Sequence, residues 1–308
     1  MRALVNTPQG PSPVEMREFP APIPAEHEAL VAIHAFSLNR GELTLMRIRP
    51  DGWRPGQDVS GVIVQAAADG SGPKAGTRIV GLLDWHGWAE RAAISTHRLA
   101  AIPDNVSFAQ AAALPIAGLT ALRTLRHGAP LLGRRVLITG AAGGVGNLAV
   151  QLALRSGADV TAVVGGSARK QFVATLGAHD IVEDITKADG KFALVLESVG
   201  GASLKTALSL LEPKGVVVMF GNSSGEETSL SFRDFGAGNN SRLQSFHSYA
   251  SGPEESIGPD LGLLAGLVGD GSLKPQLAEH SWRDFVAVTS ALRERRINGK
   301  AVFTVEQA

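Results

Sequence analysis

The stretch that decides the fold is VLITGAAGGVGNLAVQLALRSGADVTAVVGGSARK, residues Val136–Lys170. A short apolar run leads through a glycine-rich turn into a segment with apolar residues at helical spacing, and a second apolar run follows. A strand, a glycine turn, a helix and a second strand in this order are typical of a unit that binds a dinucleotide. The segment VVGGSARK stands where such a unit often presents an acidic residue.

The glycine turn follows the pattern G-x-G-x-x-G, with alanine in place of the first glycine. Glycine there permits a tight turn, close approach of backbone N–H groups to a pyrophosphate, and packing of the helix on the strand. The motif follows an apolar strand and opens a helix, which is the context that dinucleotide binding requires. The predicted pyrophosphate-binding residues are Ala141, Gly143, Gly144, Val145 and Gly146.

The end of the second strand indicates which dinucleotide is bound. In NAD-binding units an Asp or Glu about 20 residues after the turn accepts hydrogen bonds from the ribose 2′-hydroxyl. Here Gly165 and Gly166 are followed by Ser167, Arg169 and Lys170, which would pair with a 2′-phosphate rather than repel it. The sequence therefore predicts NADPH, with Arg169 favoured because its guanidinium can hold phosphate bidentately. The alternative is that the two cations only begin a solvated helix face.

Strands and helices alternate from residue 134 onward. Strands are expected at 135–140, 159–164, 181–182, 192–196 and 215–220, and helices at 144–156, 168–176 and 202–211. This alternation predicts a doubly wound parallel sheet. The tail after residue 257 predicts a helix, a strand, a helix and a last strand, which we expect to return to the N-terminal domain.

The first 112 residues instead contain brief apolar or alternating runs divided by Gly, Pro and Asp, which predict a barrel-like β domain. Helical spacing begins in 106–126, where Pro115 and Gly118 interrupt it. We therefore expect a catalytic, substrate-binding domain at 1–115 and 253–308 and a Rossmann domain at 116–252. The fold class is α/β, with a Rossmann sheet plus a β-rich catalytic domain.

The amino-acid composition indicates which kinds of molecule the protein binds. The 308 residues include 44% hydrophobic and 19% charged residues, as in globular proteins. Lys plus Arg and Asp plus Glu both number 29, so net charge does not favour nucleic acid. No segment predicts a signal peptide or a membrane span. We expect a cytoplasmic protein that acts on an apolar small molecule and binds neither nucleic acid nor membrane.

AAGGVGNLAVQLA, residues 141–153, resembles the cofactor motif of the medium-chain dehydrogenase/reductase superfamily, and of its zinc-independent quinone oxidoreductase branch in particular. Further similar pieces follow the family's order along nearly the whole chain: SLNRGEL, GQDVSGVIV, GWAE, LPIAGLTAL, LGA, FGNSSG and GKAVF. The resemblance implies a distorted β-barrel catalytic domain and reduction of a quinone or activated double bond by NADPH. It also implies a homodimer, for which GVVVMFGN at 215–222, near the end of the sheet, is a candidate pairing strand.

The resemblance assigns roles to individual residues. Asn39 and Thr120 correspond to residues near the nicotinamide and the hydride acceptor. Asn222 and Ser223 correspond to the loop over the cofactor. Lys300, after Gly299, corresponds to the C-terminal return, and the resemblance implies that it contacts the cofactor.

The 2′-phosphate pocket of the family is matched by Gly165, Ser167 and Arg169. Arg295 lies close to where some relatives bring a second arginine to this phosphate.

Catalytic zinc is not expected. Zinc-dependent relatives keep cysteine and a Gly-His-Glu segment, whereas this chain has no cysteine and carries Gly56-Gln57-Asp58. Glutamine is a poor zinc ligand, and no thiolate exists. His34, His86 and His97 lack ligand spacing.

The acceptor and the proton donor stay open. Arg40 follows Asn39, where related reductases often carry an aromatic residue. The Asn39 amide, the Thr120 hydroxyl or a backbone N–H would stabilise charge on the substrate oxygen. Trp53, Trp85 and Trp88 are candidates for the wall of an apolar cleft or for the core. Tyr249, the only tyrosine, is the only phenol that would act as an acid.

Two other functions also remain. A zinc-independent alcohol dehydrogenase would need a general acid, and no Ser-Tyr-Lys constellation is evident. A non-catalytic NADPH-binding redox sensor would share the whole cofactor half.

Overall fold

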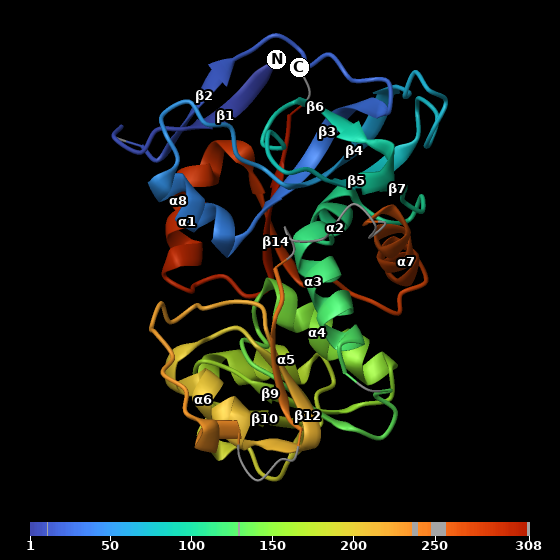
Figure 1. Cartoon of the computed structure of the whole chain (residues 1–308). Coiled ribbons are helices and arrows are strands. Elements are labelled where there is room, and N and C mark those ends of the chain that lie inside the picture. The colour runs from blue at the N-terminus through green and yellow to red at the C-terminus, as the bar shows by residue number, and fades with distance from the viewer. Residues whose placement is uncertain (11, 129, 236–239, 248–256, 307–308) are drawn as a thin grey trace. The chain divides into compact units, whose positions relative to one another are not determined.

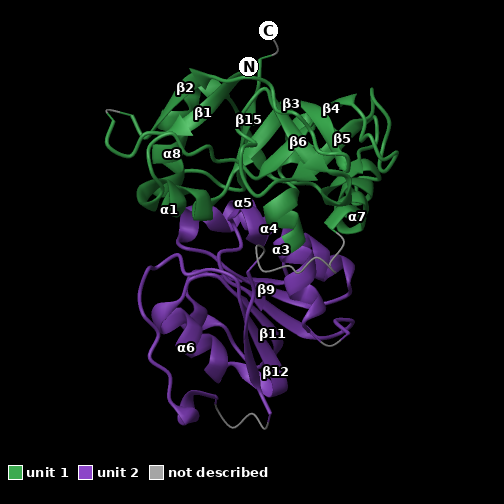
Figure 2. Cartoon of the chain, turned by 45° about the horizontal axis from the view of Figure 1, so that its top comes forward, with its two compact units in different colours: residues 1–119, 252–308 green, residues 120–251 purple. Residues whose placement is uncertain are grey.

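The computed structural model describes residues 1–10, 12–128, 130–235, 240–247 and 257–306 (Figure 1). The chain divides into two compact units (Figure 2). Unit 1 comprises Met1–Leu119 and Gly252–Ala308, and unit 2 comprises Thr120–Ser251. Tyr249 and the expected boundary at 252/253 lie outside the described residues.

Unit 2 is built on a six-stranded parallel sheet, which confirms the predicted Rossmann architecture. Its strand order is β10-β9-β8-β11-β12-β13. The strands are β8 (Arg135–Ile138), β9 (Asp159–Val163), β10 (Asp180–Val182), β11 (Phe192–Glu197), β12 (Leu211–Met219) and β13 (Arg242–Ser245). The helices after the strands are α4 (Gly144–Arg155), α5 (Lys170–Ala174) and α6 (Gly201–Ser209).

Two expectations for unit 2 need correction. Strand β13 was not predicted, and it pairs in parallel with β12 from Val216↔Arg242 to Met219↔Ser245. The segment 215–222 is therefore not at the edge of the sheet, and β13 is the outer strand. The helix expected at 168–176 is shorter, because a 3₁₀ turn, η2 (Ser167–Arg169), precedes α5.

Unit 1 contains a seven-stranded, mainly antiparallel sheet, in which β6 branches off β3. Its strands are β3 (Glu28–Leu38), β4 (Asp58–Gln65), β5 (Arg78–Leu82), β6 (Arg91–Ser95), β7 (Leu99–Ala101), β14 (Leu277–Ser281) and β15 (Lys300–Thr304). A separate ribbon pairs β1 (Arg2–Asn6) with β2 (Val14–Glu18). Strand β15 pairs antiparallel with β3, so the tail returns to the N-terminal segment as predicted.

The helices of unit 1 are α1 (Arg40–Ile48), α2 (Phe108–Ala112), α7 (Ile257–Gly269) and α8 (Phe285–Arg293), and α3 (Pro115–Arg126) begins in it. The tail thus has the predicted order of helix, strand, helix and strand. Helix α1 packs against α8. Among the described residues, no helix is long and apolar enough to cross a membrane.

An aromatic core fills unit 1. Phe36 stacks on Phe303 at 5.2 Å between ring centroids, and Trp88 lies 4.6 Å from Phe285. The Trp88 side chain is fully buried, so Trp88 belongs to the core rather than to the wall of a cleft. Trp53 is only half-buried against this core.

Candidate active site

The glycine turn of unit 2 joins β8 to α4. Gly140 has φ +63°, in the left-handed region that favours glycine, and Gly143 is the N-cap of α4. A Cβ on Gly146 would lie 2.3 Å from the carbonyl oxygen of Gly140, so α4 can pack this closely only with glycine there. Residues 143–145 are half-exposed at the start of the 12-residue helix. The turn thus presents a helix N-terminus suited to a pyrophosphate.

The second predicted element is the turn after β9. Gly166 has φ +111°, and η2 follows it directly. A Cβ on Gly165 would lie 3.2 Å from Nη1 of Arg169, so Gly165, Ser167 and Arg169 share one short turn. The Lys170 ammonium instead lies 3.3 Å from a carboxylate oxygen of Glu183.

The loop with Asn222 and Ser223 follows β12. The backbone N–H of Ser223 donates to the carbonyl of Ser198 at 3.0 Å, so the loop is fixed to the segment that follows β11. The side chains of Asn222 and Ser223 are both exposed. A side chain on Gly200 would collide with Asn222, since a Cβ there would lie 2.1 Å from Asn222 Oδ1.

Glu197, the last residue of β11, was missed from the sequence. Its buried carboxylate accepts hydrogen bonds from the backbone N–H groups of Val199 at 3.0 Å and Gly200 at 2.9 Å and from the Ser203 hydroxyl at 2.9 Å. Burial raises the pKa of Glu197, against the effect of these hydrogen bonds. An acidic residue that ends an apolar strand three positions before a pair of glycines was the available signal.

Glu197 also lies between the two predicted cofactor loops. Thr139, before the glycine turn, donates to Glu197 Oε1 at 3.4 Å and accepts the backbone N–H of Ser198 at 2.8 Å. Ser198 in turn accepts the N–H of Ser223. The carboxylate therefore fixes a segment that is bonded to both loops.

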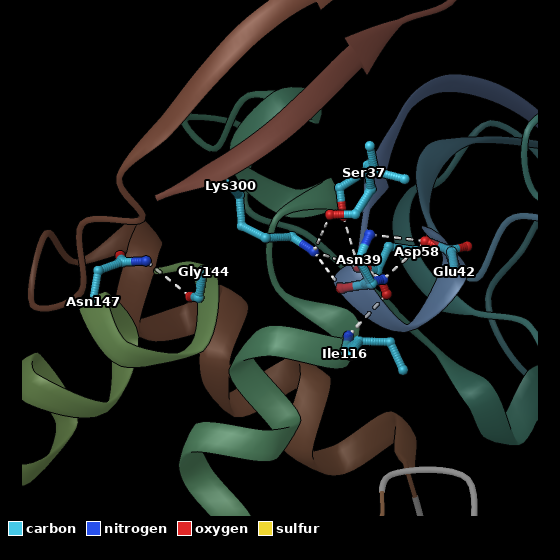
Figure 3. A network of polar contacts seen from close by, with 9 residues as sticks. Ser37, Asn39, Glu42, Asp58, Ile116, Gly144, Asn147 and Lys300 are labelled. Carbon is cyan, nitrogen blue, oxygen red and sulfur yellow. Dashed lines mark hydrogen bonds and ion pairs between the residues drawn. The ribbon is translucent and has the colours of Figure 1, made fainter. Parts of the chain in front are cut away.

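In unit 1 a buried polar network gathers where β3, β4 and β15 meet (Figure 3). Asp58 Oδ2 accepts hydrogen bonds from Ser37 Oγ at 2.6 Å, Asn39 Nδ2 at 2.9 Å and Lys300 Nζ at 3.0 Å. Asp58 Oδ1 accepts the backbone N–H of Ile116 at 2.9 Å, at the start of α3. The structure thus brings together Asn39 and Lys300, which are 261 positions apart in the chain.

The Asn39 amide is engaged inside this network. Nδ2 donates to Asp58 and to Glu42 Oε2, at 3.3 Å, and Oδ1 accepts from Lys300 Nζ at 2.6 Å. Both amide hydrogens are used, so a bond to a substrate oxygen would require breaking one of these contacts. Lys300 is 4% exposed, and its ammonium donates hydrogen bonds to Asn39 Oδ1, Asp58 Oδ2 and the Leu38 carbonyl.

Glu42 completes the network. Its Oε2 accepts the backbone N–H of Asn39 at 2.9 Å at the start of α1, and its Oε1 is buried without a hydrogen-bond partner in the described part of the chain. Burial, with the Asp58 charge as the second cause, raises the pKa of Glu42 to about 8. Folding therefore favours the protonated form of Glu42.

The remaining predicted residues lie in different surroundings. Thr120 is buried on α3, and its hydroxyl has no hydrogen-bond partner within the described ranges. Arg295 follows α8 in unit 1 with φ +60° and is exposed.

The segment that holds zinc ligands in zinc-dependent relatives is buried. Gln57 is 1% exposed, and Asp58 is bonded to Lys300. No group of three or more His, Cys, Asp or Glu side chains suited to a metal occurs within the described ranges.

Comparisons with known proteins agree with this arrangement. The family model for zinc-binding dehydrogenases matches residues 144–261. The quinone oxidoreductase of Pongo abelii is 32% identical over 231 residues, which cover 69% of this chain and 70% of that protein. The 2-methylene-furan-3-one reductase of Solanum lycopersicum is 33% identical over 63% of this chain and 53% of that protein.

The fold has a close match among solved structures. The Escherichia coli quinone oxidoreductase, solved in complex with NADPH, superposes with a TM-score of 0.88 over 99% of this chain and 100% of that chain, at 24% identity. Fold and sequence similarity together place this chain in the medium-chain dehydrogenase/reductase superfamily, as an oxidoreductase of its quinone oxidoreductase-like branch.

Proposed function

We propose that this protein is an NADPH-dependent reductase that transfers hydride to a quinone or an α,β-unsaturated carbonyl compound without zinc. The observation that carries the proposal is the Gly165–Arg169 turn, which offers a guanidinium and a hydroxyl and no carboxylate. The names of the two relatives, a quinone oxidoreductase and a reductase of a methylene-furanone, support the acceptor class.

The residues of unit 2 fit a dinucleotide. The close approach that Gly146 permits leaves the start of α4 open for a pyrophosphate. Arg169 would hold the 2′-phosphate, and the loop with Asn222 and Ser223 would lie along the nicotinamide half. When bound, the cofactor supplies the hydride, and the chain's own residues orient it and exclude water.

Charge that develops on the acceptor oxygen needs a hydrogen-bond donor. Because the Asn39 amide is engaged with Asp58 and Glu42, we assign this role to the Thr120 hydroxyl. Asn39 then acts as a positioning residue at the start of α1. The proton that follows the hydride is taken from water in this proposal.

Zinc independence rests on chemistry as well as composition. A dication near Gln57 and Asp58 would face the Lys300 ammonium, which lies 3.0 Å from Asp58 Oδ2. The chain also has no cysteine to neutralise a metal. We expect metal analysis to find less than about 0.1 zinc per chain, and chelators to leave turnover unchanged. About one zinc per chain would contradict this part of the proposal.

We further propose a homodimer. Among the described strands β13 is the outer strand of the unit 2 sheet, so one of its edges has no strand partner there and is our candidate for pairing with a second copy. Phe232, in the turn η4 (Phe232–Phe235) before β13, is 94% exposed. Light scattering is expected to give twice the chain mass, and a monomer mass at working concentration would refute this assembly.

To test the function, the protein is mixed with NADPH and a panel of quinones, enones and simple ketones. Consumption of NADPH is measured as the loss of absorbance of the reduced nicotinamide. Consumption with quinones or enones supports the proposal. Turnover on ketones alone would indicate an alcohol dehydrogenase, and binding without turnover would indicate a redox sensor.

A further inference from the structure

Two tryptophans and an arginine form a cluster at the far end of α1 from Asn39. The indoles of Trp53 and Trp85 meet edge to face with 5.1 Å between centroids. The Arg49 guanidinium carbon lies 5.8 Å from the Trp53 ring centroid and 5.7 Å from that of Trp85. Arg49 is exposed and the indoles are half-buried, so the cluster reaches the surface. We call these three residues the Arg49 cluster.

Backbone hydrogen bonds fix the loop that carries Arg49 and Trp53. Asn6, fully buried at the end of β1, donates through Nδ2 to the carbonyl of Arg49 at 2.9 Å. Its backbone N–H donates to the carbonyl of Trp53 at 2.8 Å, and its carbonyl accepts the N–H of Gly52 at 2.9 Å. The first side of the cluster is therefore held in place before any ligand binds.

The second loop, with Trp85, is attached in the same way. The N–H of Leu83 donates to the carbonyl of Gln57 at 2.8 Å, and that of His86 donates to the carbonyl of Arg54 at 3.2 Å. Two ordered loops thus present the cluster, which lowers the entropy that a ligand would have to overcome.

The positive charge of Arg49 is not neutralised locally. The two acidic residues nearest to the cluster in sequence are engaged elsewhere: Asp51 pairs with Arg17 at 3.4 Å, and Asp84 pairs with Arg98 at 2.9 Å. Within the described ranges the Arg49 guanidinium has no hydrogen-bond or ion-pair partner. Its N–H donors are therefore available to an anion.

A second guanidinium adds to the charge. Arg54 lies over the Phe19 ring, 4.6 Å from its centroid, and its Nε is buried without a hydrogen-bond partner among the described residues. Burial and, secondly, the charge of Arg54 lower the pKa of His86. This part of unit 1 thus combines aromatic surface with positive charge.

We propose that the Arg49 cluster binds a planar organic carboxylate. A guanidinium offers paired N–H donors that match the two oxygens of a carboxylate, and indoles offer apolar surface for a flat ring. A neutral ligand would contact only the indoles of the Arg49 cluster.

Such a carboxylate could belong to the hydride acceptor or to a separate effector. Asn39 and Arg49 cap opposite ends of α1, about 15 Å apart at the helical rise of 1.5 Å per residue. An acceptor would have to span this distance, whereas an effector would not. Binding itself does not depend on the proposed reductase activity.

The test is calorimetric titration of the full chain with 2-naphthoate and with neutral, isosteric 2-naphthamide, without cofactor. We expect Arg49→Gln to weaken naphthoate about tenfold or more and naphthamide less than about twofold. Arg49→Lys keeps the positive charge but loses the paired N–H donors of the guanidinium. Its affinity for naphthoate should therefore lie between those of the wild type and Arg49→Gln. Trp85→Leu should weaken both ligands.

Arg47→Gln is the matched control. Arg47 is also exposed, lies in the last turn of α1 and has no aromatic contact in the described part of the chain. This variant removes the same charge and should change neither affinity. Equal affinities of naphthoate for the wild type and Arg49→Gln, undetectable naphthoate binding, or equal losses in both arginine variants would overturn the proposal.

Kinetics then separate the two sources of the carboxylate. Inhibition by naphthoate that is competitive with the acceptor would show that the cluster forms part of the acceptor site. Retained binding without competition would identify a separate effector site. Failure of all acceptors to turn over would refute the reductase and leave the calorimetric result standing.

Discussion

The Lys300 ammonium lies 3.0 Å from Asp58 Oδ2, and both side chains are buried, with 4% and 0% of their surface exposed. This ion pair connects the first residue of β15 to the first residue of β4. Through Asn39 and Ile116 it also reaches the starts of α1 and α3. The C-terminal return is thus part of the same buried network as the predicted catalytic asparagine.

Removing the ammonium should destabilise unit 1 strongly. In Lys300→Met the Asp58 carboxylate would remain buried without its cation, and this typically costs about 3–5 kcal/mol. The double variant Lys300→Met/Asp58→Asn should be more stable than Lys300→Met alone, because no uncompensated charge remains. Urea unfolding measures both differences.

The matched control for that experiment is the exposed pair Arg296–Glu294, with 61% and 57% of the side chains accessible. Arg296→Met should change the unfolding midpoint little, since exposed ion pairs contribute little. Equal effects of Lys300→Met and Arg296→Met would show that burial of the pair has no special importance.

Glu42 should make stability depend on pH. Its pKa is raised from 4.5 to about 8 in the folded chain, so folding favours the protonated form. Stability from this group is fully present below its ordinary pKa and is lost as pH rises through about 8. Glu42→Gln removes this dependence, so the variant should be more stable than the wild type at about pH 9 and no more stable at about pH 5.5.

Urea midpoints at both pH values check the expectation, with the exposed Glu294→Gln as control. Parallel pH curves for the wild type and Glu42→Gln would mean that Glu42 is ionised in the fold.

Much of unit 2 could be predicted because its signals are local. An apolar run such as 136–138 lies between turn residues, and the helix after it keeps its apolar residues at helical spacing. Strand β13 was missed because RLQS has no apolar run and most of its residues are exposed. An edge strand of this kind is defined by backbone pairing with β12, which leaves little trace in the sequence.

Only part of the candidate site could be predicted from the sequence. Backbone conformation selects glycine at Gly146, so the glycine turn could be recognised. The meeting of Asn39, Asp58 and Lys300 depends on strand pairing between distant segments, and no spacing rule encodes it. Lys300 is predicted at the cofactor from family resemblance alone, and no local pattern predicts the contacts of its ammonium with Asn39 and Asp58.

Glu197 should matter for cofactor binding in general rather than for the choice between cofactors. In Glu197→Gln an amide NH₂ would face the N–H groups that the carboxylate now accepts, which loosens the segment bonded to both cofactor loops. We expect NADH and NADPH to lose affinity by the same factor, about tenfold. Asp189→Asn, at an exposed acid of the same unit, is the control. Unchanged dissociation constants with a lowered unfolding midpoint would assign Glu197 to stability alone.

Arg169 should decide between NADPH and NADH. Arg169→Ala should lose a charge-assisted contact of roughly 1.5–3 kcal/mol with the 2′-phosphate, about ten- to a hundredfold in NADPH affinity, while NADH should hardly change. Lys170→Ala is the matched control, because it removes the same charge one residue later from a side chain paired with Glu183. It should affect NADPH far less.

Gly165→Asp should also shift preference toward NADH, and it should do so by two routes. A Cβ at this position would lie 3.2 Å from Arg169 Nη1, so the new carboxylate would pair with the guanidinium and withdraw it from the phosphate. The same carboxylate would repel the 2′-phosphate and accept a hydrogen bond from the 2′-hydroxyl of NADH. Dissociation constants for both cofactors, measured by titration on all three variants, test the assignment. Equal losses of NADH and NADPH affinity in Arg169→Ala would show that Arg169 supports the fold, and the NADPH assignment would then be wrong.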